Sequence, residues 1–288
     1  MIERSEAELH GAPVLWLRNA HCRAALSLHG GQLLSFAPQG QDDWLWLSPT
    51  SKRPPGAVRG GVPVCWPYFG REGQPAQVPQ HGFARTSTWT LDDLREEGED
   101  IVVELSLPAN EASPLRLRQV LRLGRSLRQS LTTSNAGSRP IAFTQALHSY
   151  FRVGDAMRAT LHGVDGLRYA DRHDGAEHLQ TGDWNLHDPR DSGRSDRTYR
   201  DAGAEFVLED PALGRSLRIR SSGSRALVVW NPGASGVAAL GDVPADGWRD
   251  FICVEVANAG ADVIELAPGA RHVLAQHVES GPLRDRAR

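Results

Sequence analysis

The chain has 288 residues, of which 40% are hydrophobic and 23% are charged, and its formal net charge is −3. These values are ordinary for a globular protein, whereas domains that bind nucleic acids are usually strongly basic. The N-terminus lacks the basic start and apolar run of a signal peptide, and no stretch is long and apolar enough to cross a bilayer. We therefore expect a cytoplasmic protein whose partners include neither nucleic acid nor membrane.

Cysteine and lysine usage give little functional information. Cys22, Cys65 and Cys253 lie far apart, and no Cys/His cluster has the spacing of a zinc site. A sparse, odd number of cysteines predicts a reducing compartment and no disulfide framework. Lys52 is the only lysine. We interpret this as compositional bias, so an arginine becomes a functional candidate only through its position.

Short segments with a period of two run along most of the chain. In 115–123, leucines and Gln119 share one face, while arginines and Val120 share the other, as in a strand with one buried side. Many short strands separated by turn residues predict an all-β sandwich, with helices few and short. The predicted strands are 14–18, 24–28, 44–47, 101–107, 115–123, 127–133, 141–147, 205–208, 216–220, 227–230, 252–256, 263–266 and 272–277.

Two long regions have little strand pattern. The first, 48–86, is rich in glycine, proline and aromatic residues, and the second, 166–201, is polar, with several His and Asp. Loops of this length are uncommon in a compact domain unless they serve a function. We expect both to wall a binding site in a single domain (1–288), whose core spans about 12–278 between short flexible termini.

The first segment with candidate chemistry is 58–70, VRGGVPVCWPYFG. Its two glycines permit a close backbone approach or a positive φ. Trp66, Tyr68 and Phe69 offer flat apolar faces that suit a sugar ring, although packing in the core is the better interpretation for any one of them. Arg59 stands directly before the glycines, which makes it a better candidate for binding than the strand arginines.

The second segment, 79–85, reads PQHGFAR. Gln80 can bond sugar hydroxyls through both ends of its amide, and Arg85 can hold a phosphate with two parallel charge-assisted bonds. Taken alone, His81 is more often a hydrogen-bonded loop or core histidine than a ligand.

Two further candidates lie on predicted strands. His148, in 145–151 (QALHSYF), is either a buried core histidine or an acid at the mouth of the strand. Glu255 interrupts the apolar strand 251–258 (FICVEVAN). A buried carboxylate must find a partner, shift its pKa or face a polar cavity; the alternative is an edge strand with Glu255 facing water.

Together and in this order, these four segments resemble the aldose 1-epimerase (galactose mutarotase-like) superfamily, and within it the hexose-6-phosphate mutarotase branch. The resemblance covers about residues 30–268. It implies a β-supersandwich fold, no metal, no organic cofactor and a small phosphosugar substrate. Nothing in the sequence demands a second chain, so we expect a monomer.

The resemblance also implies roles for individual residues. His148 matches the catalytic histidine, the expected general acid at the ring oxygen, and Glu255 matches the catalytic glutamate, the expected base at the anomeric hydroxyl. The matching substrate-binding positions are Arg59, Gln80, Arg85, the adjacent His81, and Asp196 in the segment SDRTY. The loop 171–194 matches nothing in the family pattern.

Interconversion of anomers requires a proton to leave the anomeric hydroxyl and another to reach the ring oxygen, which suits a paired Glu and His. We expect Glu255 to start ionised and His148 protonated, each supporting the charge of the other. The alternatives are a neutral-sugar aldose 1-epimerase, a non-catalytic sugar-phosphate sensor, and a glycoside hydrolase that uses Asp196 as its second acid.

Overall fold

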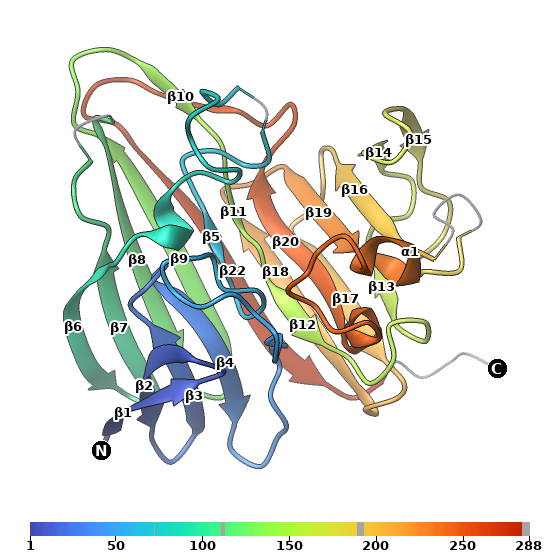
Figure 1. The fold of residues 1–288 in the computed structure, drawn as a ribbon, viewed down its shortest axis with the longest axis horizontal. Helices are drawn as coiled ribbons and strands as arrows, with labels where there is room; N and C mark the ends of the chain where they lie inside the picture. Colours follow the sequence, from blue (N-terminus) through green and yellow to red (C-terminus); the bar gives the residue numbers. More distant parts are fainter. Residues whose placement is uncertain (72, 111–112, 189–192, 284–288) are drawn as a thin grey trace.

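The computed structural model describes residues 1–71, 73–110, 113–188 and 193–283, and antiparallel strands make up most of its regular structure (Figure 1). Within these ranges the helical elements are α1 (Gly233–Val237) and the 3₁₀ segments η1 (Ala84–Thr86) and η2 (Gly247–Asp250), none of them long and apolar enough to span a membrane. The prediction of an all-β fold with few short helices is confirmed. The expected flexible C-terminal end, 284–288, lies outside the described residues.

One large sheet carries the strand with the clearest sequence pattern. In Leu115–Leu123 the leucines and Gln119 are buried, while the arginines and Val120 are not, as predicted. In spatial order the sheet contains β13 (Thr160–His162), β17 (Glu205–Asp210), β18 (Arg215–Ser222), β22 (Arg271–Gly281), β9 (Leu127–Asn135), β8 (Leu115–Leu123), β7 (Asp100–Ser106) and β6 (Thr90–Glu97).

The second large sheet packs face to face on the first. Trp66 donates a hydrogen bond to Thr133 of β9 at 3.0 Å, and Ser149 donates one to Gln276 of β22 at 2.9 Å. Its strands, in spatial order, are β15 (Glu177–Leu179), β14 (Arg168–Asp171), β16 (Ser195–Tyr199), β19 (Ala226–Asn231), β20 (Phe251–Asn258), β11 (Gln145–Leu147) and β5 (Val64–Cys65), with β12 (Tyr150–Arg152) also paired to β20. The central strand β20 is buried along its whole length.

Two smaller sheets complete the fold. β10 (Ile141–Phe143) pairs with β21 (Ile264–Leu266). The N-terminal sheet has the order β1 (Glu3–Leu9), β2 (Ala12–Arg18), β3 (Cys22–Ser27) and β4 (Gln32–Pro38), and in Figure 1 it lies in front of β7 to β9. Leu26 and Phe36 of this sheet share one apolar core with Leu105 and Leu121.

Three of the regions interpreted from the sequence differ in the structure. The region 166–201, predicted as a loop, contains β14, β15 and β16, because its polar residues pair at one side of the second large sheet. The predicted strand 44–47 forms only isolated bridges, from Leu45 to Phe151 and from Leu47 to Gly60. The predicted strand 141–147 is divided between two sheets at Thr144, whose backbone N–H is donated to Pro67 instead.

A ladder of buried amides explains the polar residue on the apolar face of β8. Gln119 donates to the carbonyl of Gly31 at 2.6 Å and accepts from Gln129 at 2.7 Å; Gln129 in turn accepts from Gln276 at 3.0 Å. Gln276 then accepts from Ser149, the residue after His148. Buried polar groups are tolerated where each has such partners, so the side chains of this ladder are accommodated in the interior of the protein.

Candidate active site

A cavity of about 260 Å³ brings together residues from both long loop regions and from the second large sheet. It is lined by Arg59, Phe69, Gln80, His81, Arg85, His148, Arg172, Asp196, Val228, Trp230, Leu240 and Glu255. Every polar residue that the sequence singled out therefore faces one cavity, although these residues span almost 200 positions of the chain.

His148 and Glu255 face each other in this cavity. His148 Nδ1 lies 3.4 Å from Glu255 Oε1, and the two side chains are 9% and 1% exposed. Glu255 sits on the central strand β20, so the alternative of an edge position facing water is wrong. The spacing suits two neighbouring sugar oxygens, because the anomeric and ring oxygens are bonded to the same carbon.

A break in the sheet brings this pair together. β20 pairs with β11 up to Leu147, opposite Val256, and with β12 from Tyr150, opposite Cys253. His148 lies in the gap between β11 and β12, where its N–H is donated to the carbonyl of Pro63 at 3.0 Å. Because His148 belongs to neither paired segment, its side chain does not follow the alternation of the sheet, and it lies beside Glu255.

Stacking and charge hold the imidazole and the nearest arginine. The rings of His148 and Tyr150 stack with centroids 4.9 Å apart and an interplanar angle of 7°. The Tyr150 hydroxyl accepts a bond from Arg59 Nη1 at 2.9 Å, and Arg59 Nε donates to Asp242 at 3.2 Å. Asp242 is buried, so Arg59 is fixed at the cavity wall by two partners.

The protonation of the pair differs from the sequence expectation. His148 Nδ1 and Glu255 Oε2 are both buried without a hydrogen-bond partner. Burial, and then Arg59 and Arg85, lower the pKa of His148 well below 6.5, and burial, with a contribution from Asp196, raises the pKa of Glu255 well above 4.5. Both shifts oppose the charged forms. Burial therefore favours the neutral form of each group over the expected ion pair.

The segment 79–85 forms the opposite wall. His81 Nδ1 accepts the Gly70 N–H at 3.2 Å, which leaves the ring neutral with Nδ1 as an acceptor, and its Nε2 lies 3.3 Å from the Gln80 amide nitrogen. Burial and Arg85 lower the pKa of His81 well below 6.5, in keeping with this neutral form. Arg85 Nη2 donates to the Gln80 carbonyl at 2.9 Å, which orders the segment around the cavity.

Two glycines of the segment 58–70 are required by close contacts. A Cβ at Gly60 would lie 2.4 Å from the carbonyl oxygen of Trp46, and one at Gly61 would lie 2.3 Å from that of Leu33. Both glycines have positive φ. Since no other residue fits these two restrictions, the glycine pair fixes the backbone from which Arg59 reaches the cavity.

Arg172 is a site residue that the sequence reasoning missed. It belongs to the loop that matched no family pattern, and its guanidinium lies 5.7 Å from the Phe69 ring centroid. Its N–H is donated to the carbonyl of Asp196 at 3.0 Å, and its Nε lies 3.9 Å from the Asp196 carboxylate. The one sequence signal was the polar character of 171–173 beside a binding-site loop.

The three aromatic candidates have different environments. Phe69 lines the cavity, whereas Trp66 and Tyr68 do not. Trp66 is 1% exposed and packs edge-on against Phe83 in the core. Trp230 lines the cavity with its ring 6.1 Å from that of His148. It was also missed, because the sequence shows it only as the end of an apolar strand.

Potential metal ligands meet at the same place. One donor atom each of His148, Cys253 and Glu255 lies within 4.8 Å of the others, a combination that sequence spacing cannot reveal. Cys253 does not line the cavity, whereas Arg59, Arg85 and Arg172 do. The positive charges of these three arginines repel a cation, so His148, Cys253 and Glu255 fit an acid–base pair better than a metal centre.

The sequence and the structure both match known proteins. Residues 13–279 match the family described as Aldose 1-epimerase. The chain is 33% identical over 264 residues to a protein of Escherichia coli (strain K12) named "Putative glucose-6-phosphate 1-epimerase", covering 88% of this chain and 86% of that protein. A crystal structure of a "putative mutarotase (YeaD)" from Salmonella typhimurium superposes with a TM-score of 0.87, at 30% identity, over 97% of this chain and 94% of the other.

A "galactose mutarotase-like protein" from Lactobacillus casei has the same fold, with a TM-score of 0.71 at 18% identity, over 93% of this chain and 100% of that one. The fold and the family match are those of a sugar epimerase. The chain belongs to the aldose 1-epimerase family. The predicted galactose mutarotase-like fold is confirmed.

Proposed function

We propose that the protein interconverts the α and β anomers of a hexose 6-phosphate, with glucose 6-phosphate as the reference substrate. The observation that carries the proposal is the His148–Glu255 pair, 3.4 Å apart, in a cavity lined by three arginines. The names of the relatives point to the same substrate.

The pair acts by exchanging protons with the two oxygens bonded to C1, the anomeric hydroxyl and the ring oxygen. Glu255 accepts the proton of the anomeric hydroxyl while His148 donates one to the ring oxygen, and the C1–O5 bond breaks to give the open-chain aldehyde. After rotation about C1–C2, the ring oxygen attacks the other face of C1 and the two protons return. Opening leaves both side chains neutral, which is the state that burial favours.

The phosphate supplies the charge balance for the starting state. Arg59 and Arg85 lower the pKa of His148, and a bound phosphate dianion offsets their positive charge. Substrate binding therefore favours the imidazolium that donates the first proton. Arg59, Arg85 and Arg172 are placed to bind this dianion, because a guanidinium group binds phosphate through two parallel hydrogen bonds.

Magnetisation exchange between the two anomers of glucose 6-phosphate, measured by NMR, tests the proposal. We expect fast exchange with the wild type and a loss of about 10² to 10⁴ in rate with His148→Ala or Glu255→Gln. Arg85→Ala should raise KM more than it lowers kcat. Wild-type exchange by Glu255→Gln would contradict the mechanism, and equal rates on glucose and glucose 6-phosphate would contradict the phosphate assignment.

A further inference from the structure

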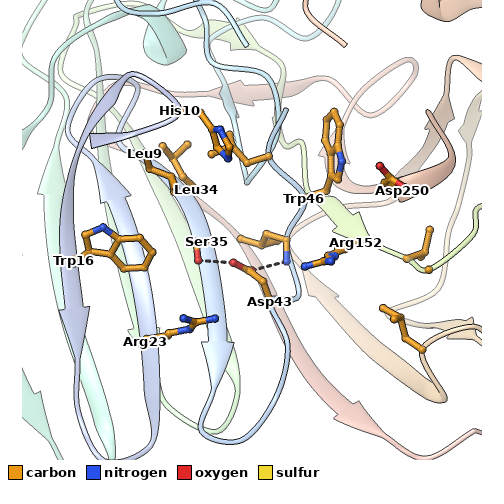
Figure 2. Close-up of a pocket in the computed structure, with 15 residues that line it drawn as sticks. Leu9, His10, Trp16, Arg23, Leu34, Ser35, Asp43, Trp46, Arg152 and Asp250 are labelled. Carbon is orange, nitrogen blue, oxygen red and sulfur yellow. Dashed lines mark hydrogen bonds between the residues drawn. The ribbon is translucent and has the colours of Figure 1, made fainter. Parts of the chain in front are cut away.

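A second cavity lies between the N-terminal sheet and the segments next to β12. Its volume is about 420 Å³, within the range of small-molecule sites, and its lining shares no residue with the catalytic cavity. Figure 2 shows Trp16 and Arg23 on one wall and Trp46, Arg152 and Asp250 on the other. We call it the N-terminal groove.

The two arginines of the N-terminal groove have unused hydrogen-bond donors. Within the described residues, neither the Arg23 nor the Arg152 side chain takes part in a hydrogen bond or an ion pair, and both residues are exposed. Each arginine interacts electrostatically with a carboxylate of the same cavity, Arg23 with Asp43 and Arg152 with Asp250. Guanidinium groups in this state suit an anionic ligand such as a phosphate.

Asp43 lies between the two arginines in Figure 2, and its carboxylate is already hydrogen-bonded to neighbouring residues. Its carboxylate accepts bonds from the Ser35 hydroxyl and from the N–H groups of Phe36 and Leu45, the latter two at 3.0 and 2.9 Å. It therefore braces the groove floor and leaves the arginine donors available. The half-buried indole of Trp16 adds flat apolar surface of the kind that packs on a sugar ring, whereas Trp46 is buried against Phe251 and Tyr150.

The N-terminal groove is joined to the catalytic pair by stacked rings. Trp46 stacks on Tyr150 with centroids 6.0 Å apart, and Tyr150 stacks on His148 at 4.9 Å. The backbone follows the same route, since Trp46 donates its N–H to Tyr150 and Arg152 donates its N–H to Trp44, both at 2.9 Å. A ligand that moves Trp46 or Arg152 therefore acts on the support of His148.

We propose that the N-terminal groove is a second site, which binds a sugar phosphate through Arg23, Arg152 and the Trp16 indole and changes the turnover of the catalytic cavity through the Trp46–Tyr150–His148 stack. The proposed binding of a sugar phosphate in the N-terminal groove does not depend on the proposed function. The proposed effect on turnover rests on the proposed function, because its readout is anomer exchange.

Glucose 1-phosphate is a suitable probe, because its esterified C1 oxygen prevents anomerisation. Calorimetric titration uses the full chain carrying Arg59→Ala and Arg85→Ala, which weakens binding in the catalytic cavity. We expect saturable binding of one equivalent, and a loss of about tenfold or more when Arg23→Ala and Arg152→Ala are added. The control Arg116→Ala, at an exposed arginine of β8, should change nothing.

Three results would contradict sugar-phosphate binding in the N-terminal groove: no saturable binding, binding that survives loss of Arg23 and Arg152, or equal affinity for inorganic phosphate. The last result would indicate an anion site without sugar recognition.

The proposed effect on turnover has its own test. Glucose 1-phosphate should change the kcat of anomer exchange by about fivefold or more, and Arg23→Ala with Arg152→Ala should abolish the change. Purely competitive inhibition that persists in this variant would refute the coupling. A wild type that binds the probe but exchanges no anomers would refute the proposed function and leave the site intact.

Discussion

Glu255 is a carboxyl group held in an environment that favours its neutral form. It is 1% exposed, and one of its oxygens has no hydrogen-bond partner. Because burial raises its pKa, the folded state keeps a proton that the unfolded chain loses above pH 4.5. Stability attributable to this residue therefore falls as the pH rises from 4.5 towards the raised folded-state value.

Glu255→Gln should consequently stabilise the protein while removing activity. A neutral amide of the same shape needs no proton, so we expect the free energy of unfolding at pH 7 to rise by about 1 to 2 kcal/mol. Urea denaturation at pH 5 and pH 7 measures the effect, which should be larger at pH 7. Equal or lower stability of the variant at pH 7 would show that the carboxyl group is ionised and satisfied in the folded state.

His148 sets the acid side of the pH profile. A second proton on the pair must go to an imidazole whose pKa is lowered by burial and by two arginines. We therefore expect kcat/KM, which reports the free enzyme, to be lost on the acid side only at a pH below 6.5. Arg85→Ala removes one of these positive charges and should move the acid limb to higher pH. Arg116→Ala serves as the control, and an acid limb that Arg85→Ala leaves in place would contradict this electrostatic coupling.

At the scale of elements, the segment 79–85 depends on one glycine. Gly82 has φ +73°, and a Cβ there would lie 2.1 Å from the carbonyl oxygen of Trp66. Gly82→Ala should therefore cost both the left-handed strain of about 1 to 2 kcal/mol and a displacement of the segment that carries Gln80 and His81.

Gly98→Ala is the matched control, because Gly98 has φ +64° and nothing within 4 Å of its Cβ position. We expect it to lose only the strain term, whereas Gly82→Ala loses at least about 2 kcal/mol more and raises KM. Chemical denaturation and anomer-exchange kinetics measure the two effects. Equal destabilisation by both substitutions would mean that the contact with Trp66 relaxes without cost.

The amide ladder links three strands of one sheet to the residue that follows His148. Gln129→Leu leaves the Gln119 oxygen and the Gln276 amide group without their partner. Each of the two buried groups left without a partner costs about 1 to 3 kcal/mol, so denaturation should show a loss of about 2 to 6 kcal/mol. Gln39→Leu, at an exposed position, should stay within about 0.5 kcal/mol. A near-neutral Gln129→Leu would show that the partners find other bonds.

At the scale of the whole molecule, the chain has a net charge of −3, yet three arginines line its catalytic cavity. Local positive charge attracts an anionic substrate, and salt screens this attraction. We expect kcat/KM for glucose 6-phosphate to fall several-fold between low and physiological ionic strength, a range in which the Debye length shrinks from roughly 30 to 8 Å. The value for glucose should stay constant, and parallel salt dependence for both sugars would contradict phosphate binding by these arginines.

The periodic strands and the polar residues of the site were predictable from the sequence, because alternation and a carboxylate in an apolar run are local signals. The strands β1, β4 and β6 were not predicted, since β1 and β6 are largely exposed and β4 is buried on both faces, so none of them alternates. Arg172 and Trp230 were missed for a related reason: neither disturbs its local pattern, and only the packing of β14, β16 and β19 turns them towards His148.

The sequence by itself determined the fold class, because alternation is a local signal, and its resemblance to the aldose 1-epimerase family implied the proposed acid, base and phosphate ligands. Only the tertiary structure decided the distance between His148 and Glu255, their preference for neutral forms, the third arginine and the stack that leads to the N-terminal groove. Each of these depends on groups far apart in the chain, whose approach and loss of water arise only when the sheets pack.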